Sequence, residues 1–517
     1  MTTPAAAPYR NPKGHVLGAP WTFLLPDAEP ARVLAIGRPS AETREALDRL
    51  ARLEVRDPGR TGDLPAGAFG VVAVVGRAAA RRLRRDDALA AEITRLLTPG
   101  GVLYADGPVP SSLAGAALPL AVTPVVGEAR TFAPVDHGPA RQLMAHRGLA
   151  TPVVDPERLE APASQLVRGP LARLGWRRAT LVQRSATGGP DEPPAWLREV
   201  AAASGVDIGG MRWALSASGR YRSRKVVLFL LDPGATDPRY VVKLPRHPDE
   251  GGRIEREAAA LEELATIDGD HGVDVPGLAF RGHVGRERLP VLGQSALVGA
   301  PLRASLSDSA VVDALVRWVA DIGVATAGPA APGEAANRLE PLLARFFADA
   351  EPDALERQVL SDAVAAVTAA PDLPLVLEHG DLGAWNVLVG PGGRPAVLDW
   401  EAAERRGMPL WDLLYLVRSC AASSAGRRNR EEAVRDVVRR QGPFGGLQAR
   451  VVAGAAAALG LDRSLVGPLV LTCWMHRAVK ESSRRHDGPY RRLVRYCVEH
   501  RDWLAVDPAP VHWRSTA

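Results

Sequence analysis

Apolar runs alternate with segments of helical periodicity along residues 29–107. Short, continuous apolar runs at 32–37 and 70–76 predict buried strands. Residues 41–53 and 88–97 place their apolar side chains at helical spacing instead, with charged residues on the opposite face. Because strands without a polar face need cover on both sides, this alternation favours a parallel sheet between helices. The predicted fold class of this part is α/β, a Rossmann-like parallel-sheet domain.

The second half of the chain has a different order of elements. Residues 213–231 have the pattern strand, turn, strand, and residues 240–244 form a further short strand. Helical spacing follows at 253–264 and again at 309–325 and 354–369. Strands followed by helices are typical of an α+β arrangement. We therefore predict an α+β region after the Rossmann-like one.

Composition limits the class of protein. A chain of 517 residues exceeds what one core normally serves, so two or three domains are expected. Its three cysteines have no metal-like spacing and form no even disulfide set, which favours a reducing cytoplasm. No secretory leader and no apolar run of about 18 residues is visible, which predicts no membrane span but leaves peripheral association open. No specific nucleic-acid module is recognisable despite a pI near 9.3.

A stretch between residues 375 and 401 carries the clearest candidate chemistry. Two β-rich runs, 387–389 and 396–398, flank a Gly-Pro-Gly-Gly turn, which predicts a hairpin. Three oxygen-bearing side chains stand at the ends of this hairpin: Asp381, Asn386 and Asp399. Hard cations such as Mg²⁺ prefer such ligands and keep positions for water and phosphate. An ordinary hairpin with polar ends is the simpler alternative.

His379-Gly380-Asp381, with Asn386 five residues on and Leu398-Asp399-Trp400-Glu401 after it, resembles the catalytic core of aminoglycoside phosphotransferase-like kinases. This family of small-molecule kinases includes choline kinase-like enzymes and is similar in fold to protein kinases. The resemblance implies a bilobal domain that uses ATP and Mg²⁺. Asp381 would orient and deprotonate a substrate hydroxyl, while Asn386 and Asp399 would hold the metal. His379 would orient the loop, and a buried carboxylate at Asp412 would brace it.

The same resemblance assigns positions to the nucleotide. A loop of small residues would cover the phosphates: Ser216, Ser218 and Gly219. Lys243 would contact the α- and β-phosphates and would be held by Glu257. The backbone from Ser295 to Leu297 would bond to adenine. A plain hairpin turn, a surface lysine and a surface glutamate remain the alternatives.

The segment 97–103, Leu-Thr-Pro-Gly-Gly-Val-Leu, resembles class I S-adenosylmethionine-dependent methyltransferases. The cofactor loop of such a domain needs several glycines after its first strand. Here Gly37 is followed by Arg38, Pro39 and Ser40. We therefore expect a degenerate domain with a structural or docking role. A methyltransferase with a regulatory kinase-like half stays as an alternative, as does a pseudokinase scaffold that binds nucleotide without turnover.

These readings divide the chain into four parts. Residues 1–184 would form the degenerate Rossmann-like domain, and 185–194, which are rich in Gly and Pro, the linker. The kinase-like N-lobe would take 195–298 and the C-lobe 299–517. With the linker at this place, a chain that lacks residues 1–184 is expected to leave a folded kinase domain.

The net charge of the C-terminal segment limits the class of acceptor substrate that we expect. Residues 402–517 hold 20 Lys and Arg against 11 Asp and Glu, whereas the whole chain carries only +5. The resemblance implies that this segment builds much of the acceptor pocket, and a pocket for polycations needs a surplus of carboxylates. We expect a neutral or anionic acceptor, such as a sugar, a glycan precursor or a lipid-linked head group, in preference to an aminoglycoside. An amino alcohol is a further small-molecule candidate for the acceptor hydroxyl. Arginines such as Arg491 and Arg492 could instead lie on solvated helix faces.

Overall fold

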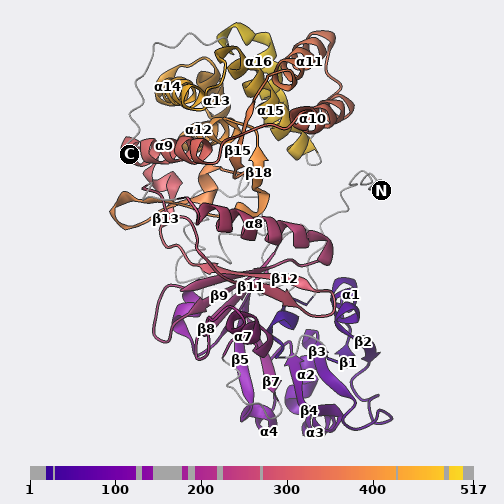
Figure 1. The fold of residues 1–517 in the computed structure, drawn as a ribbon. Coiled ribbons are helices and arrows are strands. Elements are labelled where there is room, and N and C mark those ends of the chain that lie inside the picture. The colour runs from indigo at the N-terminus through magenta and orange to yellow at the C-terminus, as the bar shows by residue number, and fades with distance from the viewer. Residues whose placement is uncertain are drawn as a thin grey trace. The chain divides into compact units, whose positions relative to one another are not determined.

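The computed structural model describes residues 19–26, 30–123, 131–143, 177–183, 192–217, 225–267, 272–426, 429–482 and 488–504. The chain forms two compact units (Figure 1). The sheet unit lies within residues 12–255 and 277–296, and the helical unit takes residues 256–276 and 297–517. The boundary passes through helix α8 (Gly251–Leu264).

Among the described residues, the sheet unit contains one mixed sheet of 12 strands in the order β11-β12-β10-β9-β8-β6-β5-β7-β4-β3-β1-β2. The strands, in chain order, are β1 (Arg32–Gly37), β2 (Arg52–Arg56), β3 (Phe69–Val75), β4 (Leu97–Ala105), β5 (Ala117–Thr123), β6 (Thr131–Pro134), β7 (Arg177–Gln183), β8 (Arg212–Ser216), β9 (Val226–Leu231), β10 (Tyr240–Leu244), β11 (Leu278–Val284) and β12 (Leu289–Ser295). Its helices include η1 (Pro20–Leu24), α1 (Ala41–Leu50), α2 (Arg77–Arg85), α3 (Asp87–Leu96) and α7 (Ala195–Ala202).

The first four strands are parallel, in the order β2-β1-β3-β4. The apolar runs predicted as strands form β1 and β3, which are buried along most of their length. Helix α1 begins after Ser40, whose hydroxyl accepts a hydrogen bond from the Thr43 amide at 3.1 Å, an ordinary N-cap. Beyond β4 the sheet continues with antiparallel β7, β5 and β6. The Rossmann-like assignment of this part stays a prediction.

Gly37 at the end of β1 is fixed by close packing. Its φ is 112°, and a Cβ there would lie 2.4 Å from the carbonyl oxygen of Val75 at the end of β3. A side chain would therefore collide with backbone, which has little room to shift. Since the next residues lead directly to the Ser40 cap, the connection from β1 to α1 is short and holds no further glycine.

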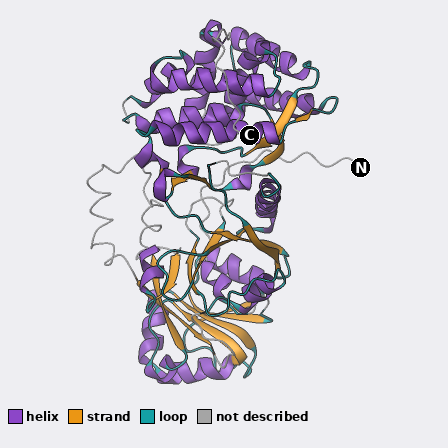
Figure 2. Ribbon diagram, turned by 60° about the vertical axis from the view of Figure 1, so that its left-hand side comes forward, coloured by secondary structure: helices purple, strands orange, loops and turns teal. Residues whose placement is uncertain are grey.

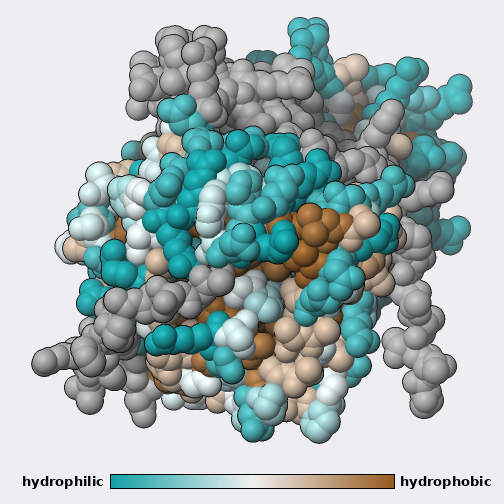
Figure 3. All heavy atoms as spheres, turned by 90° about the horizontal axis from the view of Figure 1, so that it is seen from above, coloured by the Kyte–Doolittle hydropathy of each residue, from teal (hydrophilic) through white to brown (hydrophobic). Residues whose placement is uncertain are grey.

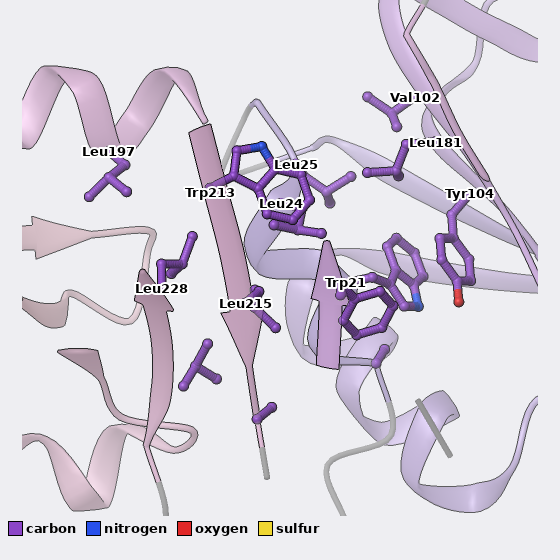
Figure 4. Packing of buried hydrophobic residues seen from close by; sticks show 14 of the residues in the cluster. Trp21, Leu24, Leu25, Val102, Tyr104, Leu181, Leu197, Trp213, Leu215 and Leu228 are labelled. Carbon is purple, nitrogen blue, oxygen red and sulfur yellow. The ribbon is translucent and has the colours of Figure 1, made fainter. Parts of the chain in front are cut away.

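A short antiparallel pairing joins the N-terminal strands to those of the segment that the sequence predicts to be kinase-like. In it, Thr131 of β6 pairs with Ser216 of β8, and Phe132 pairs with Leu215. One hydrophobic cluster also spans the two parts (Figure 4). Trp21, which stacks on Tyr104 at 4.2 Å between ring centroids, belongs to the same cluster as residues of β8 and β9. Strands on either side of the predicted linker thus share one sheet and one core.

This shared core predicts the outcome of a truncation. Deleting residues 1–184 would remove β6 from the edge of β8 and expose core side chains such as Trp213 and Leu215, which are at most 1% exposed. Each large apolar side chain lost from a core costs about 1.5–3 kcal/mol, against a total stability of about 5–15 kcal/mol. We now expect an aggregated or unfolded product, in contrast to the expectation from the linker. Size-exclusion chromatography and circular dichroism beside the full chain test this; a monomeric, cooperatively melting fragment would contradict it.

The helical unit contains two small sheets, each of three strands in the described residues, β13-β16-β17 and β14-β15-β18 (Figure 2). Its strands are β13 (Ala300–Pro301), β14 (Gly328–Pro329), β15 (Pro374–Glu378), β16 (Val387–Val389), β17 (Pro395–Val397) and β18 (Glu404–Gly407). Its longer helices are α9 (Ser309–Ala325), α10 (Glu334–Ala350), α11 (Ala354–Thr368), α12 (Trp411–Ser424), α13 (Arg430–Val438), α14 (Gly442–Ala458), α15 (Val466–Ser482) and α16 (Pro489–Glu499). The segments predicted as helices at 309–325 and 354–369 are α9 and α11.

A buried ion pair ties α11 to α16. Both guanidinium nitrogens of Arg491 donate to Glu356, one of them at 2.7 Å, and the two side chains are only 7% and 3% exposed. Arg491 is therefore not a surface arginine, which was one reading of the basic C-terminal segment.

The face drawn in Figure 3 is mostly hydrophilic, with hydrophobic residues in small patches. None of the helices in the described ranges is both long and apolar enough to cross a membrane.

Candidate active site

The loop after β15 carries the predicted catalytic residues. It runs through His379, Gly380 and Asp381 into the short helix η5 (Ala384–Asn386) and then into β16. Strands β16 and β17 form the predicted hairpin, with Val387 opposite Val397. Asp399 follows two residues after β17. The hairpin thus returns the chain from one predicted metal ligand towards the other.

The backbone of the loop depends on Gly380. Its φ is 71°, and a Cβ there would lie 2.3 Å from the carbonyl oxygen of Ala402. The amides of His379 and Gly380 both donate to the carboxylate of Asp412, the second at 3.1 Å. Burial and the neighbouring Glu378 carboxyl raise the pKa of Asp412 to about 8, although the hydrogen bonds from the two amides and the charge of Arg477 partly offset this. Asp412 is costly to ionise at this position, and the hydrogen bonds from the loop offset part of that cost.

His379 links the two ends of the hairpin in its neutral form. Burial lowers the pKa of its imidazole, although the Leu398 carbonyl and the carboxylates of Asp381 and Asp399 partly offset this. Its Nε2 lies 2.9 Å from the Leu398 carbonyl oxygen, which can only accept, so Nε2 carries the proton. Its Nδ1 then accepts a hydrogen bond from the Asp381 amide at 3.2 Å. Both ring nitrogens therefore bond to backbone groups, which agrees with the positioning role predicted for His379.

Asn386 and Asp399 have side-chain oxygen atoms of the kind that bind a hard cation. The Asn386 side-chain nitrogen lies 2.9 Å from the Asp381 carbonyl oxygen and 3.5 Å from a carboxylate oxygen of Asp381. These contacts use the nitrogen and leave the amide oxygen for another partner. The Leu398 amide donates to the Asn386 carbonyl at 2.8 Å, which holds the two segments together. Asp399 has a left-handed backbone, with φ 71° and ψ 61°, a strained geometry often found at functional sites.

Sequence reasoning missed Arg477 of α15, which contacts Asp381 directly. Its guanidinium lies 2.8 Å from the Asp381 carboxylate and 3.0 Å from the Gly380 carbonyl oxygen. It also bonds to the Tyr415 hydroxyl and lies 3.6 Å from the centre of that ring. Burial lowers the pKa of Arg477, but Tyr415, Tyr490 and Asp381 together raise it above its usual value. The arginine therefore stays charged and holds Asp381 in one orientation.

Two more side chains border this loop. Lys480, one helical turn after Arg477, donates to the Gly380 carbonyl at 2.7 Å and is otherwise exposed. Trp385 is 57% exposed and meets the Tyr415 ring edge to face, with ring centroids 5.9 Å apart. The only sequence signal for the basic pair was its spacing of three residues within a largely apolar segment, which places both on one helix face.

Among the described residues, no group of three or more His, Cys, Asp and Glu side chains could hold a metal ion by itself.

Residues 218–451 match the phosphotransferase enzyme family. The matched segment is somewhat less than half of the chain and contains the loop from His379 to Asp381 together with Asn386, Asp399 and Asp412. The match identifies the chain as a small-molecule phosphotransferase. Arg477 and Lys480 lie beyond the matched segment. A comparison with curated proteins gave no match.

Solved structures of similar proteins include a glucosamine kinase, 17% identical, with a TM-score of 0.37, covering 62% of this chain and 86% of that one. The apoenzyme of the macrolide 2'-phosphotransferase MphH from Brachybacterium faecium is 23% identical, with a TM-score of 0.32, covering 57% and 98%. A ternary complex of a thermostable aminoglycoside phosphotransferase APH(4)-Ia mutant with AMP-PNP and hygromycin B is 14% identical, with a TM-score of 0.36, covering 56% and 95%. Similarities this distant carry no conclusion about the acceptor of this phosphotransferase.

The predicted nucleotide residues of the phosphotransferase fall on both units. Ser216 ends β8 and Lys243 lies in β10, and both are buried in the sheet unit. Glu257 is buried in the part of α8 that belongs to the helical unit. Ser218 and Gly219 lie outside the described residues. The pairing of Lys243 with Glu257 stays a prediction.

Some of the backbone groups predicted to bind adenine already form hydrogen bonds within the sheet unit. The Ser295 amide donates to the Gly277 carbonyl at 2.8 Å, and the Ser295 hydroxyl accepts from the Gly277 amide at 2.8 Å. The Ala296 amide donates to the Arg239 carbonyl at 2.9 Å. Of the predicted backbone donors, the Leu297 amide is the one that these contacts do not use.

Proposed function

We propose that this phosphotransferase transfers the γ-phosphoryl group of ATP to a hydroxyl of a neutral or anionic small molecule, with Mg²⁺. The substrate hydroxyl donates a hydrogen bond to the Asp381 carboxylate. Asp381 then takes the hydroxyl proton as the phosphoryl group is transferred. Arg477 and the His379 imidazole fix the orientation of Asp381, so that little reorganisation is needed during the reaction. Asp412 fixes the loop that carries it.

Asn386 and Asp399 would hold Mg²⁺ through their side-chain oxygens. The metal would neutralise phosphate charge and orient the transferred group. On the nucleotide side, Lys243 would contact phosphate oxygens, and Glu257 would hold the lysine. Ser216, Ser218 and Gly219 would cover the phosphates, and the backbone at Ser295 and Leu297 would meet adenine. Support for these roles comes from the family match and from the burial of Lys243 and Glu257.

The acceptor class rests on one observation, the pair of cations at the catalytic loop. Arg477 and Lys480 both bond to the Gly380 carbonyl, directly beside Asp381. Because Arg477 is already paired with Asp381, the pair of cations leaves one net positive charge beside the loop, that of Lys480. This charge repels an ammonium group and attracts a carboxylate or phosphate. Trp385 offers an exposed ring beside the same loop, a surface suited to the apolar face of a sugar. We infer that an acceptor with a sugar-like ring and no positive charge fits best.

Acceptors that share one ring and differ in charge test this proposal. We expect kcat/KM to be lowest for glucosamine and higher for glucose and glucuronate. Reversing one charge, with Lys480→Glu, should improve the glucosamine to glucuronate ratio by about tenfold, the effect of roughly 1.4 kcal/mol. Arg450→Glu is the control, because it makes the same charge change at an exposed position on α14. An unchanged ratio, or kcat/KM for kanamycin of about 10⁴ M⁻¹s⁻¹ or more, would contradict the proposed acceptor class.

The N-terminal strands have a structural part in this proposal. They complete the sheet and the core that carry Lys243, as the pairing of β6 with β8 indicates. The truncation described above tests this role.

A reducing cytoplasmic location is also proposed, since Cys420, Cys473 and Cys497 are all free and buried. Burial raises the pKa of Cys420 and of Cys497 to about 12, so these thiols are poor nucleophiles.

A further inference from the structure

A cavity lies within the sheet unit, in a place that the proposed reaction does not use. It has a volume of about 120 Å³ and opens between η1, α1, α7 and the turn from β11 to β12. The side chains that define its chemistry are Phe23, Arg49, Trp196, Arg246, Arg286 and Glu287. Its walls come from the N-terminal part of the chain and from the segment that matches the phosphotransferase family. Neither part forms the cavity alone.

The lining is strongly basic. Among the described residues, the lining holds three guanidinium groups and one carboxylate, that of Glu287. Arg49 and Arg286 are exposed at the rim, and in the described part of the chain Arg49 has no ion-pair partner. Like charges gathered at one concave surface repel one another and raise the local concentration of anions. The positive surplus therefore favours an anionic occupant.

Arg246 supplies a fixed cation at the inner wall. It is only 5% exposed, and its guanidinium donates to the Ala217 carbonyl oxygen. A buried guanidinium that is already held in place loses little conformational entropy when it binds a ligand. Its planar set of donors suits carboxylate and phosphate groups, which accept two parallel hydrogen bonds. The anionic group of an occupant would face this residue.

Apart from Thr22, the remaining lining is apolar and partly aromatic. Trp196 is 7% exposed, and Phe23 and Leu50 are half-buried beside it. Most ligand sites combine an apolar wall with a few polar groups that set orientation. A bare inorganic ion would leave this wall in contact with water. We propose that the cavity is an accessory binding site for a small organic anion with an apolar body, such as an aryl carboxylate or aryl phosphate.

Calorimetry on the full chain tests the site with benzoate and phenyl phosphate as probes, and with benzamide as the uncharged counterpart of benzoate. Saturating AMP-PNP and Mg²⁺ are present, so that binding at the nucleotide site does not contribute. We expect one site per chain with a Kd of about 1 mM or tighter, given the small size of the probes, and at least tenfold weaker binding of benzamide. The double variant Arg49→Ala/Arg286→Ala should weaken benzoate binding by about tenfold or more.

Arg44→Ala is the matched control, since it removes an exposed arginine from another position on α1. It should leave the affinity for benzoate unchanged. Equal affinities for benzoate and benzamide, no binding of either anion, or an affinity that the double variant does not alter would each overturn the proposal. Because activity is not the readout, these outcomes are independent of whether the proposed phosphoryl transfer is correct.

Discussion

Replacing Asp381 by alanine should lower kcat by about 10² to 10⁴, the contribution of a positioned general base. ATP binding should remain nearly unchanged, because Asp381 acts on the acceptor hydroxyl. Steady-state kinetics with the best acceptor gives kcat, and calorimetry with AMP-PNP gives nucleotide affinity. Asp362→Ala is the control, since this exposed carboxylate on α11 bonds only to the nearby Gln358 among the described residues. Turnover near that of the unmodified chain would remove Asp381 from the mechanism.

Arg477 makes a second variant necessary. Removing Asp381 leaves the 8% exposed Arg477 side chain without its carboxylate, although Gly380 and Tyr415 still bond to it. A charge that loses its buried partner destabilises a fold by about 3–5 kcal/mol, and less here because the Asp381 side chain is 33% exposed. Asp381→Asn keeps the size of the side chain and a hydrogen-bond acceptor for Arg477. Equal losses of kcat in both variants, with the Asn variant melting near the unmodified chain, separate catalysis from stability.

Asp399→Asn should raise the Mg²⁺ concentration needed for half-maximal activity by about tenfold or more, because a neutral amide is a poorer ligand for a hard cation. Asparagine tolerates a left-handed backbone nearly as well as aspartate, so the φ of 71° is not a source of new strain. Titrations of Mg²⁺ at fixed ATP compare the two proteins.

Glu404→Gln is the control for this titration, since it removes a charge from an exposed position in β18. It should leave the Mg²⁺ curve in place. Superimposable curves for Asp399→Asn and the unmodified chain would exclude Asp399 from the metal site.

The hairpin of the candidate site could be predicted because its determinants are local. The strand runs and the turn between Val387 and Val397 lie within a few residues of one another, and β-propensity and turn chemistry act at that range. Helices such as α9 could be predicted for the same reason, since Asp308 caps a segment with regular apolar spacing.

Contacts between distant segments could not be predicted from one sequence. Arg477 reaches Asp381 across 96 residues, and nothing near either residue records the pairing. The pairing of β6 with β8 crosses the predicted linker, whose composition indicates only that no helix or strand forms there. Arg491 has the sequence surroundings of a surface arginine, yet it is buried against Glu356 of another helix. In each case tertiary packing determines which residues come into contact, and the local sequence does not indicate the contact.

The most direct test of the central claim follows the γ-phosphate itself. ATP labelled with ³²P at the γ position is incubated with Mg²⁺ and the neutral and anionic sugars above, and the labelled products are separated from ATP and free phosphate. The account predicts acceptor-dependent label in a sugar phosphate, made by the unmodified chain and reduced by about 10² or more in Asp381→Ala. Label found only in free phosphate, or sugar phosphate formed equally by both proteins, would contradict it.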